Sequence, residues 1–445
     1  MLMTRIILKV DEPMPEIGKC PLHLNAKLHS VFHSSRIAIA CLLQLLICLP
    51  GISQVCTLSE YIDKGVKHSP VLQDLSNQIL LNQYDSLISR ASYLPQVNFN
   101  GLMMYAPVIN DWGYSDVITN GQNLIGTINV NQDIFNKKNR EAHSEKYGLA
   151  SGKLKNAKNI SLNELKKAIT AQYLAAYAAR EEHTFQKEIL SSLKNESAIL
   201  KAWTEKGIYR QTDYLSMQVE MLNLGRNIRD LDLQYRREWW NLNLICGIGD
   251  TVLCNLALPV IHDTVGKTEE NSIFFRSFVI DSLVIKNEKL LIDRRYKPVV
   301  TWFADGGLIN NEPQYLYQNF GISAGLSMTL PIFDGNQRKF NYQKIRMQEE
   351  TRKNYQDNFR FRYHSQLRQL QSELETTRRY MQENEKQISL SQELVAADKI
   401  LLNTGAALIT DYILAIKNLI EAKHAGLVYQ IRTQYILNEI NFWKQ

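Results

Sequence analysis

Residues 320–332 carry the clearest hydrophobic pattern of the chain, in which apolar side chains alternate with small or polar ones. A period of two is typical of a strand that has one apolar face. A weaker copy of the pattern occupies 123–135, where Asn and Thr take many of the alternate positions. Each alternating segment follows a candidate partner strand. We therefore expect two hairpins, with strands at about 96–108 and 123–135 and at about 298–307 and 319–332.

The rest of the chain is rich in helix formers, and its two longest proline-free runs predict two unusually long helices. At 1.5 Å per residue each run would extend roughly 100 Å, far more than a globular core needs. A shorter helix is expected after each long one, and another before each hairpin. The helix nearest the C-terminus shows apolar residues at spacings of three and four, which is typical of a helix packed along a neighbour. The expected helices lie at about 71–92, 137–205, 211–245, 271–295, 337–403 and 410–443.

The order of these elements repeats, and short motifs repeat with it. Two motifs recur 198 positions further along the chain, so the 78 residues that separate them have the same length in both copies, as long helices lying side by side require. The hairpins differ by five residues, because Pro95 and Pro298 are 203 positions apart. The paired motifs are Ile134-Phe135-Asn136 with Ile332-Phe333-Asp334, and Gly207, Thr212 and Asp213 with Gly405, Thr410 and Asp411.

An uncharged run of 14 residues at 37–50 follows Arg36 and precedes Gly51-Ile52-Ser53. The run is too short to cross a bilayer of about 30 Å, and the small residues after it fit a signal peptidase site. We expect a secretory signal peptide with a long amino-terminal region. The predicted division of the chain is a signal peptide at 1–53, a first repeat at 54–250, a linker at 251–270 and a second repeat at 271–445.

Past the signal peptide no stretch of 18 apolar residues occurs, so a membrane-embedded part would have to be a closed β-barrel. A soluble, half-buried sheet produces the same alternation. The helices, however, show no apolar face wide enough to cover a separate sheet, so we favour lipid on one face of the strands and water on the other. Four strands cannot close, because the smallest membrane barrels have about eight. The sequence thus predicts an oligomer that shares one barrel.

The formal net charge is +6, of which +2 falls within the first 36 residues. The remaining positive charge is spread without runs, which argues against nucleic acid as a partner. The histidines show no metal-ligand spacing, and the sequence contains no recognisable phosphate-binding loop or nucleophile motif. We expect no catalytic, cofactor-binding or metal-binding residues, and therefore no enzyme.

Three cysteines follow the signal peptide, at Cys56, Cys246 and Cys254. Cys246 and Cys254 flank a short glycine-containing segment, and an oxidising compartment would permit a disulfide between them. Free buried thiols are the other interpretation that the sequence leaves open. Cys56 is left unpaired in both. A lipid anchor on Cys56 is disfavoured, because Val55 stands where a small residue is expected.

Several motifs, each weak alone, become specific through their order, spacing and duplication. They are Leu330-Pro331-Ile332-Phe333-Asp334-Gly335 after the last strand and the Gly-x5-Asp turns that begin at Gly207 and Gly405. From Gln54 to Trp443 the chain resembles the TolC-like outer-membrane efflux protein family. The resemblance implies a homotrimer whose 12-stranded barrel, four strands per chain, lies in outer-membrane lipid of a Gram-negative bacterium and continues as an α-helical tunnel into the periplasm.

The same resemblance implies partners and a place for the linker. The tunnel would dock a periplasmic adaptor protein that works with an inner-membrane transporter, in tripartite efflux or type I secretion. The linker between the repeats would lie in the equatorial region of the tunnel. No chemistry is done on the substrate in this family, and no cofactor is implied.

In that family the Gly-x5-Asp turns form the periplasmic tip, where acidic side chains ring the closed aperture. By this resemblance Gly207 and Gly405 end the long helices as glycines with positive φ. The residues after them would line the constriction and cap free N–H groups of the return helices. The implied tip residues are Thr212, Asp213, Thr410 and Asp411, and the implied strand-to-helix junction residues are Phe135, Pro331, Phe333 and Asp334.

The chain departs from better-known members of the family at three tip positions. Leu414 stands where they have a second acidic residue, and Leu402 and Ala407 stand where they have polar latch residues. We therefore expect a gate that is less charged and held mainly by packing. Asp411 is the expected pore-lining carboxylate.

A periplasmic coiled-coil adaptor protein is the alternative function, since it too has a signal peptide and a long helical hairpin. One such hairpin is enough for an adaptor. An adaptor would not repeat at an offset of 198 residues with a strand pair ahead of each long helix. The duplication therefore favours the channel.

Overall fold

The computed structural model describes residues 55–107, 109–110, 112–114, 122–249, 253–264, 266, 268–406 and 408–445. These residues belong to one unit, Val55–Gln445. The expected signal peptide at 1–53 lies outside them. None of the helices in these ranges combines the length and the apolar character needed to cross a bilayer.

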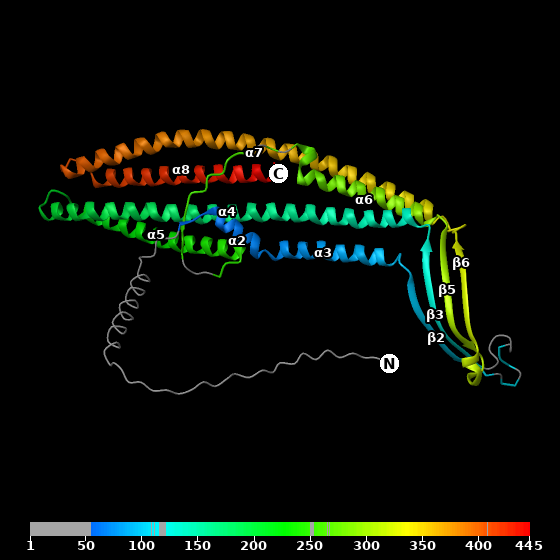
Figure 1. Cartoon of the computed structure of the whole chain (residues 1–445). Helices are drawn as coiled ribbons and strands as arrows, with labels where there is room; N and C mark the ends of the chain where they lie inside the picture. The colour runs from blue at the N-terminus through cyan, green and yellow to red at the C-terminus, as the bar shows by residue number, and fades with distance from the viewer. Residues whose placement is uncertain are drawn as a thin grey trace, which may run out of the picture. The chain divides into compact units, whose positions relative to one another are not determined.

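Helices make up most of this unit, and a four-stranded sheet and a two-stranded sheet complete it (Figure 1). The helices are α2 (Leu58–His68), α3 (Pro70–Ala91), α4 (Lys137–Glu205), α5 (Gln211–Cys246), α6 (Ile273–Arg295), α7 (Gln337–Asn403) and α8 (Ile409–Trp443), with 3₁₀ turns at Glu269–Asn271 and Pro313–Gln318. The strands are β1 (Val55–Cys56), β2 (Gln96–Tyr105), β3 (Gln122–Ile134), β4 (Asn255–Leu256), β5 (Val299–Asn310) and β6 (Phe320–Thr329).

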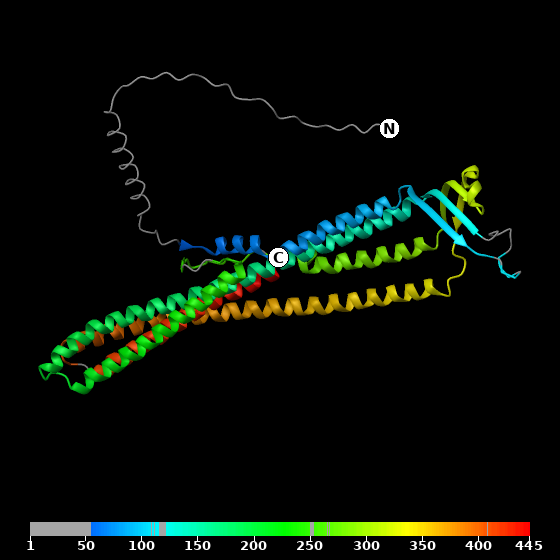
Figure 2. The same ribbon diagram turned by 90° about the horizontal axis from the view of Figure 1, so that it is seen from below.

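Two long helices, α4 with 69 residues and α7 with 67, run through the unit. Both occupy the ranges that the proline-free runs predict. α5 returns along α4 and α8 returns along α7, and α4 also contacts α8. On the side toward the sheet, α3 and α6 lie along α4, and α6 also lies along α7 (Figures 1 and 2). Each long helix is therefore accompanied by shorter helices that follow one another along its length.

Hydroxyl side chains mark the starts of α2 and α3. Thr57 accepts a hydrogen bond from the Glu60 N–H, and Ser69 accepts one from the Leu72 N–H, both at 3.4 Å. Pro70 follows as the first residue of α3, a position where a helix does not need the missing N–H. These caps explain why α2 and α3 are two helices and not one.

The largest buried cluster lies where α2, α4 and α5 meet β4, and Tyr173 and Trp239 are among its fully buried members. The Tyr173 hydroxyl lies 2.8 Å from the Cys56 carbonyl oxygen and 2.7 Å from that of Ala257. One side chain of α4 thus binds both the beginning of the unit and the segment that joins the repeats. Burial raises the pKa of Tyr173 well above its usual value, so the phenol stays a hydrogen-bond donor.

A disulfide in this region joins Cys56 to Cys254, with a Cα–Cα distance of 6.0 Å. The possible bond between Cys246 and Cys254 is therefore wrong, and so is the expectation that Cys56 is unpaired, whereas the alternative of a free buried thiol holds for Cys246. Helix α5 continues to Cys246 and buries this side chain completely, while Gly247, at a φ of 65°, ends the helix. Cys254 instead precedes β4, which pairs with β1 in parallel. Burial raises the pKa of the free Cys246 thiol to about 11.

The four-stranded sheet has the order β2-β3-β5-β6, and every neighbouring pair is antiparallel. The pair β3–β5 joins the first repeat to the second. β2 ends at Tyr105, before Pro107 and short of the predicted 108, and β6 ends at Thr329, before Pro331 and short of the predicted 332. Proline has no N–H for the ladder, so the chain leaves the sheet at both places. β5 continues to Asn310, beyond the predicted 307.

Peptide mapping under non-reducing conditions should recover Cys56 linked to Cys254, with Cys246 as a thiol. The Cys56→Ser variant should lose about 2–5 kcal/mol in free energy of unfolding, since the bond closes a loop of 198 residues. Reductant should lower the melting temperature of the wild type and of the control Cys246→Ala, but not that of Cys56→Ser. Equal melting temperatures of wild type and Cys56→Ser would contradict the assignment.

Candidate functional site

The turns from α4 to α5 and from α7 to α8 have the same geometry, and both lie at the end of the long helices that is remote from the sheet. Gly207 and Gly405 have φ values of 75° and 78°, a region that favours glycine. Behind Gly207 the Ile208 N–H donates to the Trp203 carbonyl at 2.9 Å, and behind Gly405 the Ala406 N–H donates to that of Leu401 at the same distance. This six-to-one bond is the Schellman helix end. Both glycines therefore end a long helix, as the family resemblance implies.

The acidic residues after these turns differ between the two copies. Asp213 is the third residue of α5, and its carboxylate accepts a hydrogen bond from the Arg210 N–H at 3.2 Å, so it caps the helix as expected. Asp411 is the third residue of α8, but among the described residues no N–H is bonded to its carboxylate, which is exposed. Thr212 and Thr410 are exposed as well. The second copy therefore leaves its aspartate more exposed than the first, in which Asp213 is partly buried and caps the helix.

A shared apolar core lies beneath the two turns and joins α4, α5, α7 and α8. Leu402 is only 3% exposed in it, whereas Leu414 is 58% exposed, and Ala407 lies outside the described residues. Tyr412 is also buried, and burial, with the Glu196 carboxylate nearby, raises its pKa to about 12. The core members are Leu193, Leu200, Met217, Leu224, Leu402, Ile409, Tyr412 and Ile416.

Polar contacts between the repeats surround this core. The Tyr209 hydroxyl donates to the Leu402 carbonyl at 2.9 Å, and Lys399 lies 2.8 Å from Glu196, whose side chain is 3% exposed. A buried carboxylate of this kind depends on its partner, because an unpaired charge in the interior is strongly destabilising. The sequence singles out Leu402 but not Tyr209, Glu196 or Lys399, since Tyr209 and Leu402 are 193 positions apart.

The strand-to-helix junctions lie at the opposite end of the long helices. Asp334 accepts hydrogen bonds from the Tyr296 hydroxyl at 2.5 Å and from the Arg338 N–H at 2.7 Å, so it ties the end of α6 to the start of α7. Phe135, at a φ of 60°, and Phe333 are 92% and 86% exposed. Aromatic side chains exposed at a strand end are typical of the interfacial girdle of membrane strands.

The register divides the sheet into two faces of opposite character, because directly opposite residues share a face. One face carries apolar side chains that are more than half exposed: Val97, Phe99, Met103, Tyr105, Ile128, Phe320, Ile322, Leu326 and Met328. The other face, called the polar face below, carries Gln96, Asn98, Asn100, Thr127, Asn129, Asn131, Asp133, Thr301, Asp305, Ser323, Ser327 and Thr329, with Leu102, Met104, Ile125, Phe303 and Ile309 as its larger apolar members.

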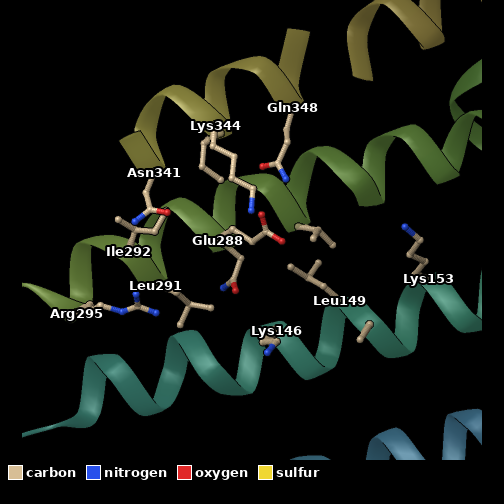
Figure 3. Close-up of a pocket in the computed structure, with 14 residues that line it drawn as sticks. Lys146, Leu149, Lys153, Glu288, Leu291, Ile292, Arg295, Asn341, Lys344 and Gln348 are labelled. Atoms are coloured by element: carbon tan, nitrogen blue, oxygen red, sulfur yellow. The ribbon is translucent and has the colours of Figure 1, made fainter. Parts of the chain in front are cut away.

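A cavity of about 440 Å³ lies between α4, α6 and α7, near their sheet ends (Figure 3). Its labelled side chains are mainly basic or apolar: Lys146, Lys153, Arg295 and Lys344 with Leu149, Leu291 and Ile292. Glu288 is its acidic member, and Lys153 pairs with Asp281 at 2.8 Å. The described residues hold no group of three potential metal ligands. The cavity is thus lined by surface charges and by apolar side chains that pack the helices. The tip and the sheet are the stronger candidates for a functional site.

No family model matches the chain, and no curated protein matches it. Solved structures do. VceC, an outer membrane protein of Vibrio cholerae, is 11% identical, with 87% of this chain and 96% of that chain covered at a TM-score of 0.71. CusC is 12% identical, with 87% and 91% covered at 0.72, and the CmeC outer membrane channel of Campylobacter jejuni is 13% identical, with 87% and 85% covered at 0.69. The chain therefore has the fold of the TolC-like outer-membrane channels.

Truncating Leu402 tests whether packing holds the two turns together. Leu402→Ala should destabilise the tip by about 2–5 kcal/mol, because it leaves a cavity in a core that both turns share. Amide hydrogen exchange should accelerate in peptides around Gly207 as well as around Gly405. The control Leu401→Ala, at a side chain that is 45% exposed, should change exchange little. Equal exchange in the two variants would rule out the shared core.

Proposed function

We propose that this chain is one protomer of an outer-membrane channel of a Gram-negative bacterium, with a large periplasmic part. It exports substrates from the periplasm or from an inner-membrane pump to the outside. The observation that carries the proposal is the sheet. On one face β2, β3 and β6 expose apolar side chains and β5 carries the partly exposed Val300, Trp302 and Leu308, while most polar side chains stand on the other face. Such a sheet suits lipid on one side and water on the other.

The sheet also supports an oligomer. Within the described residues β2 and β6 have no outer neighbour, so each presents a row of backbone N–H and C=O groups. In lipid each unpaired group is destabilising by several kcal/mol, and a closed barrel removes all such edges. Three copies of the sheet would supply 12 strands, four per chain, and a barrel of this size leaves room for a lumen. We therefore propose a homotrimer.

The helices provide the rest of the conduit. α4 and α7 leave the sheet together and end in the same turn geometry, so three copies would form a long helical tunnel that narrows at the tip. The exposed Asp411 is the proposed lining group of that constriction, and Asp213 acts mainly as a helix cap. The buried Leu402 supports a closed tip that is held mainly by packing.

A channel of this kind needs partners and no catalytic chemistry. We propose that the tip docks a periplasmic adaptor protein, which connects it to an inner-membrane transporter in a tripartite efflux or type I secretion system. The fold shared with the CusC and CmeC channels supports this assignment. Substrate choice would then belong largely to the transporter, and the chain itself would need neither cofactor nor metal.

The alternative, a periplasmic coiled-coil adaptor protein, fits the structure less well. An adaptor requires one helical hairpin, whereas this chain has two, α4–α5 and α7–α8, each preceded by a strand hairpin. The apolar side chains that the strands expose would also form an unfavourable apolar surface in an aqueous compartment. We therefore favour the channel.

Cell fractionation separates the two functions. The protein should be recovered with the outer membrane, released by detergent, and migrate as a trimer under mild conditions, because its apolar sheet face requires lipid. The purified protein should produce discrete conductance steps in planar bilayers. Recovery as a soluble periplasmic protein would favour the adaptor and would overturn the channel.

The two tip aspartates should differ in effect. Asp411→Ala should change cation block or leak of the bilayer channel several-fold, because this carboxylate is exposed and not used in capping. Asp213→Ala should leave block almost unchanged and should instead lower helix stability by about 1 kcal/mol, since it removes a cap. Conductance and thermal melting of both variants decide the matter. Unchanged block in both would remove Asp411 from the constriction.

A further inference from the structure

A ladder of hydrogen-bonded side chains crosses all four strands on the polar face. The register sets Asn129 of β3 opposite Asp305 of β5, and Asp305 opposite Ser323 of β6. The Asn129 amide donates to one Asp305 oxygen, and the Ser323 hydroxyl donates to the other at 3.2 Å. On the other side the Asn100 amide of β2 donates to the Asn129 side-chain oxygen. Neighbouring strands therefore hold both oxygens of a carboxylate near the middle of β5.

A hollow of about 400 Å³ lies beside this carboxylate. Asp305, Ser323 and Thr127 contribute polar side chains to its lining. On the polar face the next pair of opposite residues is Gly307 with Gly321, which also line the hollow. Each glycine has a different reason for lacking a side chain. A Cβ at Gly307 would lie 2.2 Å from the Gly126 carbonyl oxygen, so β3 and β5 could not approach as they do. A Cβ at Gly321 would meet nothing within 4 Å, so Gly321 simply leaves the hollow open.

The charge on the strands has one sign. β2, β3, β5 and β6 contain no Lys or Arg, and their charged residues are Asp133 and Asp305, both on the polar face. A carboxylate in the wall of a narrow, low-dielectric opening raises the local concentration of cations and lowers that of anions. At 0.1 M salt its field reaches about 10 Å, so a cation that passes close to the wall will feel it.

We propose that Asp305, with the hollow beside it, is a cation-selecting group of the channel lumen. The inference rests on the proposed function, because it needs three such sheets around one aqueous path. The ligand class is small hydrated cations, which meet one carboxylate together with the hydroxyl groups of Ser323 and Thr127. The hollow offers one carboxylate per sheet, which binds a cation weakly, as conduction requires, since an ion must also leave.

The sequence alone does not reveal this group. Asp305 stands between Ala304 and Gly306 in a strand, without a motif, and Asn129 and Asp305 are 176 positions apart. Only the pairing of β3 with β5 brings the ladder together. The tip aspartate Asp411 lies at the far end of the long helices, so the two acidic groups can be tested separately.

The test is the reversal potential of the purified channel in planar bilayers under a potassium chloride gradient. The wild type should prefer potassium over chloride at about 0.1 M salt and lose much of this preference near 1 M, where the field reaches only about 3 Å. Asp305→Asn, which keeps the shape of the side chain, should lower the permeability ratio by roughly three-fold or more at low salt. The same comparison in an Asp411→Ala background removes the contribution of the tip.

Two further variants separate charge from structure. Ser323→Ala removes one hydrogen bond and keeps the carboxylate, so cation preference should persist. Gly321→Val places its Cβ where nothing lies within 4 Å and adds two methyl groups to the hollow, so conductance should fall while the sign of the preference stays. All variants should be recovered as outer-membrane trimers before measurement.

A wild-type channel without cation preference, or an unchanged permeability ratio in Asp305→Asn in both backgrounds, would overturn the inference and leave the channel function standing. A wild type that forms no channel would overturn the proposed function itself.

Discussion

The antiparallel pairing of β3 with β5 is the interaction on which the other features depend, because its backbone hydrogen bonds join the two repeats and align their faces. A slip of one residue would turn every apolar side chain of one hairpin to the polar face. β3 runs into α4 with a break of only two residues, so the same register also sets where the first long helix begins. With 69 and 67 residues, α4 and α7 then end close enough for both turns to share one core.

Two further contacts between the repeats keep this alignment along the helices. Near the middle, the Cys56–Cys254 disulfide and the Tyr173 hydroxyl bind the start of the unit to the segment between the repeats. The bonded cysteines are 198 positions apart, so the bond closes most of the first repeat into one loop. At the tip, Leu402 and Tyr412 pack against α4 and α5. The sheet, the middle of the helical part and the tip are thus each held by a different kind of interaction.

The acidic side chains that we assign to ion selection lie at the two ends of the long helices. The strands carry two acidic side chains on the polar face, and each tip turn carries one aspartate, of which Asp213 caps a helix and Asp411 is exposed. Beneath the tip turns, the Glu196–Lys399 ion pair lies within the helical packing and serves its stability. Selection by electrostatic field, with little specific binding, is what such a distribution allows.

Local sequence determined the six longer helices and the four strands of the larger sheet to within a few residues, whereas helix α2 and the β1–β4 pair were not predicted. Period-two alternation marked the strands, the absence of proline marked the long helices, and the repeat offset marked Gly207 and Gly405 as equivalent turns whose backbone requires glycine. These signals depend on neighbouring residues, so one sequence is enough to read them. Even the errors in strand ends were local, since Pro107 and Pro331 removed an N–H that the ladder needs.

Only the tertiary structure decided which distant residues meet. Cys254 is nearer in sequence to Cys246 than to Cys56, yet parallel pairing of β1 with β4 brings Cys56 to it, while α5 buries Cys246. The Asp305 ladder and the Leu402 core likewise come from packing between segments of the two repeats. Periodicity fixes the face on which a side chain stands, but its partner depends on how the two repeats are placed against each other.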